Sequence, residues 1–151
     1  MATAFDVASY FVRLDEDNDD RSITNMKLQK LAYYAQGFYL ALYDEPLFNE
    51  RIEAWIHGPV VPELYHTFKD HGYNPIILRT DDPWNKFNDK QREVIEEVYR
   101  TFGQYSAWRL RDMTHEEPPW MNHEGMYHEN EGNLIPVEEM RDYFKTRLRT
   151  T

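Results

Sequence analysis

The stretch Asn25–Tyr43, with the sequence NMKLQKLAYYAQGFYLALY, carries the strongest helix signal in the chain. Thr24 or Asn25 can cap its start, and Pro46 disfavours a helical conformation at the residue before it. Apolar side chains recur along it at helical spacing and form one face, at Leu28, Leu31, Ala32, Ala35, Phe38, Tyr39 and Leu42. We therefore predict a central helix over residues 25–43, with Leu28, Leu31, Ala35 and Phe38 in the core.

A second stripe of this helix holds Lys27, Lys30, Tyr34 and Gly37. The two lysines fit a solvated face, a partner contact or a structural pairing with carboxylates, and Tyr34 fits either the edge of the core or an interface. A glycine inside a helix costs about 1 kcal/mol relative to alanine. Gly37 therefore indicates the close approach of another backbone.

Outward from this helix, the sequence predicts a mainly α fold of the α+β class. Helical spacing of apolar residues, with capping residues at several starts, predicts five more helices near residues 4–14, 62–70, 91–102, 107–113 and 136–148. A small β element is predicted near Arg51–Ile56 and Ile76–Leu78. We expect a compact bundle of about six helices around residues 25–43, forming a single domain over residues 1–151.

The segment Gly58-Pro59-Val60-Val61-Pro62 concentrates two prolines and a glycine in five residues. Such a sequence fixes a rigid corner, and Pro62 suits the first turn of a following helix. Trp55, His57 and this corner can simply seat that helix, or they can form a rigid docking edge flanked by aromatic side chains. Tyr65 and Trp120 are further candidates for such an edge, because tyrosine and tryptophan are enriched at binding hot spots.

Composition excludes several classes of protein. The 151 residues include 17 Lys+Arg and 27 Asp+Glu, for a net charge of −10, and no cysteine. Disulfides and cysteine-ligated metals are therefore impossible. No secretory signal or long apolar stretch is visible, which predicts a cytoplasmic protein without a membrane segment. The acidic balance argues against direct nucleic-acid binding and suits a basic partner. Much of it lies in residues 15–20, which we expect to be a solvated loop, and in residues 116–131, a long irregular segment whose aromatic and methionine side chains suggest that it packs down.

The sequence predicts no catalytic, metal or cofactor site. Asp15, Asp17 and Asp19 match the first ligand positions of a calcium loop, but Met26 stands where a bidentate glutamate is needed. His123 and His128 are one residue too far apart for the zinc-binding HExxH helix. No glycine-rich phosphate loop or serine nucleophile motif occurs, so a metal-dependent hydrolase is the weakest functional class.

Three segments resemble a known family. The first segment is residues 25–37 (NMKLQKLAYYAQG), and the second is residues 53–65 (EAWIHGPVVPELY). A third and weaker segment is residues 114–120 (THEEPPW). The first two are specific in their combination and order. On these segments the chain resembles the Panacea, or SocA-like, antitoxin domain, found in bacteria and in phages and other mobile elements. The resemblance extends from about residue 4 to residue 144.

The resemblance implies a non-catalytic antitoxin that binds and neutralises a cognate toxin directly. Many toxins of this family act on translation or RNA, which implies a basic partner. One branch of the family is associated with delivery of its toxin to a protease, so a proteolytic adaptor or phage-encoded regulator is the alternative. On the resembling segments, the candidate partner-binding residues are Lys27, Lys30, Tyr34, Trp55, His57, Gly58, Pro59, Val60, Pro62, Tyr65 and Trp120.

Overall fold

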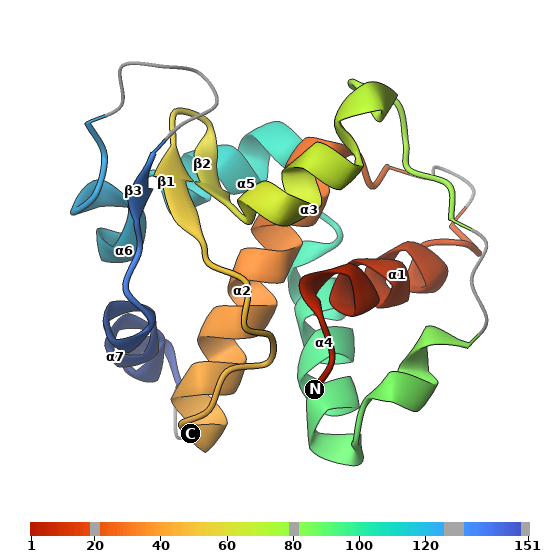
Figure 1. The fold of residues 1–151 in the computed structure, drawn as a ribbon, viewed down its shortest axis with the longest axis horizontal. Coiled ribbons are helices and arrows are strands. Elements are labelled where there is room, and N and C mark those ends of the chain that lie inside the picture. The colour runs from red at the N-terminus through yellow and green to blue at the C-terminus, as the bar shows by residue number, and fades with distance from the viewer. Residues whose placement is uncertain (19–21, 79–81, 126–131, 149–151) are drawn as a thin grey trace.

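The central helix is present with the predicted bounds. In the computed structural model, which describes residues 1–18, 22–78, 82–125 and 132–148, α2 spans Asn25–Tyr43 and runs through the middle of the molecule (Figure 1). The Thr24 side chain caps it by accepting a hydrogen bond from the backbone N–H of Lys27. The helix ends at Asp44, which adopts the left-handed conformation with φ of 55°. Other elements cover α2 on nearly all sides, so its polar stripe is buried as well as its apolar face.

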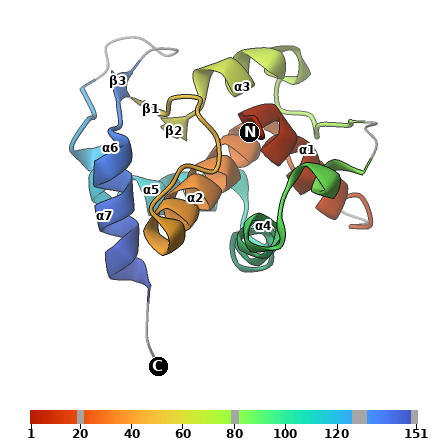
Figure 2. The ribbon, with the colours of Figure 1, turned by 60° about the horizontal axis from the view of Figure 1, so that its bottom comes forward.

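The predicted flanking helices form around α2. α1 and α4 lie on one side of it and α7 on the other (Figures 1 and 2). Capping boxes begin two of the helices, at Thr3 with Asp6 and at Asn88 with Gln91. The remaining helices in the described residues are α1 (Ala4–Leu14), α3 (Pro62–Thr67), α4 (Asp89–Phe102), α5 (Ala107–Thr114), the short α6 (Pro118–Met121), α7 (Val137–Arg147) and the 3-10 turns η1 (Lys69–His71) and η2 (Pro83–Lys86).

The β element differs in part from the prediction. β1 (Glu53–Trp55) lies in the predicted place, between β2 (Gly58–Val60) and β3 (Asn133–Leu134), and both pairings are antiparallel. The prediction of a strand at Ile76–Leu78 is wrong, because this segment pairs with no strand among the described residues; the N–H of Ile76 donates to the oxygen of Ile23 at 2.8 Å. β3 has two residues, too few for a period of two to be visible in the sequence.

Within the Gly58–Pro62 segment, predicted to be a rigid corner, Gly58–Val60 form the second strand of a tight hairpin, and Pro62 begins α3 as predicted. Trp55 pairs with Gly58, which leaves Ile56 and His57 as the turn. Pro59 is tolerated because β2 is an edge strand. Gly58 has φ of +117°, and a Cβ there would lie 2.6 Å from Cε of Lys30. Glycine is therefore required both by the backbone conformation and by the lysine packed against it.

Gly37 permits a close approach, but by a ring rather than by a backbone. A Cβ at Gly37 would lie 2.1 Å from Cε2 of Phe144, on α7. The ring of Phe144 also packs edge-on against Tyr33 and Phe38. The missing side chain thus lets α7 insert an aromatic anchor against the middle of α2.

Candidate functional site

Five of the predicted residues line one cavity beside the N-terminal half of α2. Its volume is about 240 Å³, and α2, the β1–β2 hairpin, α3 and the turn after η1 enclose it. Polar side chains of α2 hold these walls: Nδ2 of Asn25 donates to the oxygen of Tyr65, and Oε1 of Gln29 accepts from the N–H of Val61. The predicted residues in the lining are Lys30, Trp55, His57, Val60 and Tyr65, and the others are Asn25, Met26, Gln29, Lys69, Gly72 and Tyr73.

Lys30 is the most unusual residue of this cavity, because its side chain is 1% exposed. Among the described residues, no carboxylate and no hydrogen-bond acceptor pairs with its ammonium group. Burial, with a smaller contribution from the positive charge of Arg111, lowers the pKa of Lys30 to about 7. The interpretation of Lys30 as part of a solvated face is therefore wrong.

Positively charged and imidazole groups gather around Lys30. His57, at the hairpin turn, accepts a 3.2 Å hydrogen bond at Nδ1 from Nε of Arg111, on α5. Burial, followed by the charges of Arg111 and Lys30, lowers the pKa of His115 to about 4, and Nε2 of His115 has no partner in the described structure. Among the residues that the structure describes, no aspartate or glutamate lines the cavity. In a chain of net charge −10, this is a local site of positive potential.

An aromatic surface adjoins the cavity. The exposed ring of Trp108 packs edge-on against His57, with centroids 5.8 Å apart, and Arg111 lies over its face. Tyr65 packs edge-on against Trp55. Ile56, at the hairpin turn, is also exposed. We call the surface of Ile56, His57, Tyr65, Trp108 and Arg111 the hairpin face. It combines aromatic and arginine side chains, the residue types that dominate binding hot spots.

Trp120 packs between the β1–β2 hairpin and His115. Its Nε1 donates to the oxygen of Trp55 at 2.7 Å, and its ring stacks on His115 with centroids 3.9 Å apart. The Trp55 side chain is itself buried, and its Nε1 donates to Glu53. The structure thus brings Trp120 to the hairpin, but mainly as a packing residue.

The other predicted site residues lie inside the fold. Lys27 donates to the Ser22 hydroxyl and to the oxygen of Gly103, so the solvated-face interpretation is wrong for it too. The Tyr34 ring stacks on Phe102 with centroids 4.1 Å apart and is fully buried. Gly58, Pro59 and Pro62 are buried in the hairpin and at the start of α3.

One carboxylate from each acidic segment is buried, Asp15 and Glu117. Glu117 accepts from the hydroxyls of Tyr33 and Tyr34 at 2.9 and 2.8 Å, and Nη1 of Arg147 lies 3.2 Å away. Asp15 accepts from the hydroxyl of Tyr99 at 2.7 Å. The solvated-loop prediction is therefore wrong for Asp15: charge repulsion within residues 15–20 cannot reveal Tyr99, its partner 84 positions away in the sequence. Asp19, Asp20 and the residues from 126 to 131, His128 included, lie outside the described residues.

Three residues of this region, Trp108, Arg111 and His115, were not predicted as site residues. His115 lies within the third resembling segment, which was the one available signal for it. Within the described residues, no three histidine or acidic side chains lie close enough together to hold a metal ion. Nor does any helix there combine the length and apolar content needed to cross a membrane.

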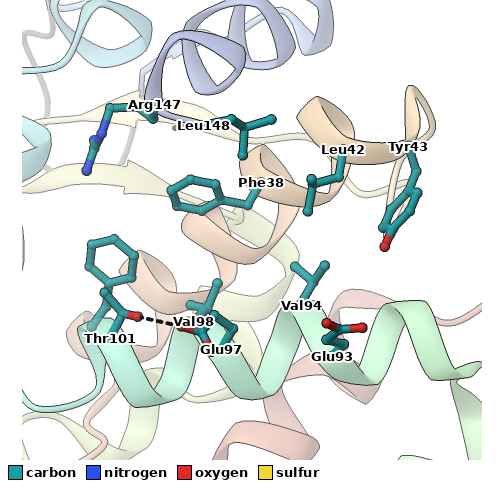
Figure 3. A pocket seen from close by; sticks show the side chains of 11 residues that line it. Phe38, Leu42, Tyr43, Glu93, Val94, Glu97, Val98, Thr101, Arg147 and Leu148 are labelled. Atoms are coloured by element: carbon teal, nitrogen blue, oxygen red, sulfur yellow. Dashed lines mark hydrogen bonds between the residues drawn. The ribbon is translucent and has the colours of Figure 1, made fainter. Parts of the chain in front are cut away.

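A larger groove lies near the other end of α2. It has a volume of about 510 Å³ and is lined from α2, α4 and the end of α7. Figure 3 shows Phe38 and Leu42 of α2 facing Val94 and Val98 of α4. Glu93, Glu97 and Arg147 also line it. None of the predicted partner-binding residues contributes to this groove.

Comparisons with known proteins agree with the resemblance seen in the sequence. Residues 28–121 match the protein family described as antitoxin SocA-like, Panacea domain. Antitoxin SocA of Caulobacter vibrioides is 37% identical over 112 residues, which cover 67% of this chain and 60% of the relative. The matched segment thus spans less than two thirds of the relative's length. No solved structure matches the chain.

Proposed function

The chain belongs to the SocA-like antitoxin family with the Panacea domain, and on that premise we propose that it neutralises a cognate toxin by direct protein–protein binding. The observation that carries the proposal is the family match over residues 28–121. The net charge of −10 suits a basic partner, such as a toxin that acts on RNA or on translation, because opposite charges accelerate association.

The hairpin face is the surface that we assign to the toxin. All of its residues lie between 28 and 121, within the family match. Trp108 is 55% exposed and Ile56 is 48% exposed, so burying them on binding would contribute favourable free energy. The larger groove is less suited to the assignment, because Arg147 and Leu148, which line it, lie outside the matched region.

A co-expression experiment tests the proposal. The product of the neighbouring gene is expressed alone and together with this protein, and cell growth is measured. We expect the product alone to stop growth and the wild-type protein to restore it. A neighbouring product that is harmless alone, or that remains toxic with this protein present, would contradict the antitoxin role.

Variants in the same assay test the assigned surface. We expect Trp108→Ala, in the hairpin face, to neutralise the toxin less well than the wild type, because loss of a hot-spot tryptophan commonly weakens binding at least about tenfold. The matched control is Leu42→Ala, a similarly exposed apolar residue in the larger groove, which should retain neutralisation. Loss of neutralisation by Leu42→Ala, with retention by Trp108→Ala, would instead assign the toxin-binding surface to the larger groove.

The toxin's half-life separates direct binding from delivery to a protease. We expect the half-life to be unchanged or longer when this protein is present. Neutralisation that requires loss of the toxin, and that disappears when the responsible protease is deleted, would support the adaptor alternative instead.

A further inference from the structure

The cavity around Lys30 has an unbalanced charge. Burying a charge is costly unless it is paired, and the described residues offer the Lys30 ammonium no carboxylate. The titratable groups that face it are His57 from the hairpin, Arg111 and His115 from α5 and its C-cap, and Lys69, Tyr65 and Tyr73 across the cavity. None of these described groups is a carboxylate. Asp112 pairs with Arg111 and is itself 70% exposed, so it does not balance Lys30.

The cavity's dimensions and walls fit a small acidic side chain. Its volume of about 240 Å³ is below the ~300–1,000 Å³ of sites for drug-sized ligands. Trp55 and Tyr65 supply apolar walls for a methylene stem, while one buried ammonium group balances one negative charge. The cavity also adjoins the hairpin face through His57 and Tyr65, so a group presented there can enter it.

We propose that this cavity binds a carboxylate group, supplied by an aspartate or glutamate side chain of the protein that docks on the hairpin face. The identity of the carboxylate as a side chain of the partner rests on the antitoxin function proposed above. The existence of the binding site does not depend on that function. Pairing of this carboxylate with the Lys30 ammonium group would offset the free-energy cost of burying the lysine. The partner, although basic overall, would then need an acidic residue at the point that faces the cavity.

The site itself is tested with acetate as the probe. Acetate is titrated into the full chain at constant ionic strength, with chloride as the replacement salt, and ¹H–¹⁵N spectra are recorded. We expect saturable shifts at Lys30, His57 and Val60. Lys30→Met should weaken acetate binding at least about tenfold, whereas Lys86→Met, which removes the same charge from an exposed position, should not. Equal binding to all three proteins would overturn the site.

A measurement on the wild-type protein covers the case in which Lys30→Met fails to fold. Acetate needs a protonated Lys30, and Lys30 loses its proton near pH 7 in the folded protein. Acetate binding should therefore weaken by about tenfold between about pH 6 and about pH 8. Binding that is independent of pH over this range would contradict a role for Lys30.

The toxin assay identifies the source of the carboxylate. Loss of neutralisation by Lys30→Met, with retention by Lys86→Met, supports an acidic side chain of the partner. If Lys30→Met loses acetate binding but neutralises like the wild type, the partner is not the source and that part of the proposal is overturned. If the wild type neutralises nothing while acetate binds, the proposed antitoxin function fails and the anion site stands.

Discussion

At the scale of single residues, Glu117 joins three parts of the chain through one carboxylate. It accepts from two tyrosine hydroxyls of α2, and it pairs with Arg147 at the end of α7. Burial raises the pKa of Glu117, while its hydrogen bonds and Arg147 act in the opposite direction. Because Tyr33 and Tyr34 are fully buried, their hydroxyls have no access to water if the carboxylate is removed.

We predict that Glu117→Ala lowers the free energy of unfolding by about 3 kcal/mol or more. Two buried hydroxyls would lose their acceptor, at about 1–3 kcal/mol each, in addition to the lost packing. Urea unfolding followed by tryptophan fluorescence measures the change. The matched control is Glu116→Ala, at the exposed preceding position, which should change stability by less than about 0.5 kcal/mol. Similar effects of the two variants would refute the role assigned to Glu117.

The residue scale is also where sequence reasoning was least successful. Spacing correctly put Leu28, Leu31 and Ala35 in the core, since apolar periodicity reports burial directly. It could not place Lys27 or Lys30, because a lysine on a polar stripe is ordinarily solvated and only the covering elements decide otherwise. For these residues the deciding contacts come from Gly103 and Gly58, more than 25 positions away in sequence.

At the scale of elements, the helices were predictable and the sheet was only partly so. Caps and apolar stripes are local signals, and the side chains of Thr3, Asn88 and Ser106 cap α1, α4 and α5. Strand pairing is a long-range property, so β1 could be placed but its partner β3 could not. The Gly58–Pro62 segment was predicted to be a corner because it holds two prolines and a glycine, yet Gly58–Val60 form a strand, which accommodates Pro59 at the edge of the sheet.

The packing of α7 on α2 gives a test at this scale. Gly37→Ala should add about 1 kcal/mol of helix propensity, but its Cβ would overlap the Phe144 ring, at 2.1 and 2.2 Å from two of the ring carbons. Overpacking of this kind costs about 1–3 kcal/mol, so we predict net destabilisation. Hydrogen exchange should show the loss of protection concentrated in α7.

A second substitution provides the control for that prediction. Phe144→Leu in the Gly37→Ala background removes the ring that causes the overlap. The double variant should therefore be more stable than the sum of the two single changes predicts, since residues in contact are coupled. Additive effects, or stabilisation by Gly37→Ala alone, would show that the ring does not limit the approach of α7.

At the scale of the whole molecule, buried bases and tyrosines combine to set how stability depends on pH. Burial lowers the pKa of Lys27 and takes that of Lys30 to about 7, against an ordinary lysine value of 10.5. Above about pH 7 the unfolded chain therefore binds more protons than the folded one, and stability rises with pH.

The buried tyrosines have the opposite effect at higher pH. Burial and hydrogen bonding to carboxylates raise the pKa of Tyr10, Tyr39 and Tyr99, and burial with the nearby charge of Glu117 raises those of Tyr33 and Tyr34. Above about pH 10 the unfolded tyrosines lose protons first, and stability falls.

We therefore predict maximal stability between about pH 9 and pH 10, above the usual range of about pH 5–8. The rise from about pH 7 has a limiting slope of about 1.4 kcal/mol per pH unit for each fully shifted lysine. Urea unfolding midpoints at about pH 7, 8.5, 9.5 and 11 measure the profile. Lys30→Met cannot titrate, so it should flatten the rise while keeping the fall above about pH 10, and Lys86→Met should leave both limbs unchanged. A wild-type protein that is equally stable at about pH 7 and pH 9.5 would mean that Lys30 is paired in solution, by an anion or by rearrangement of its neighbours.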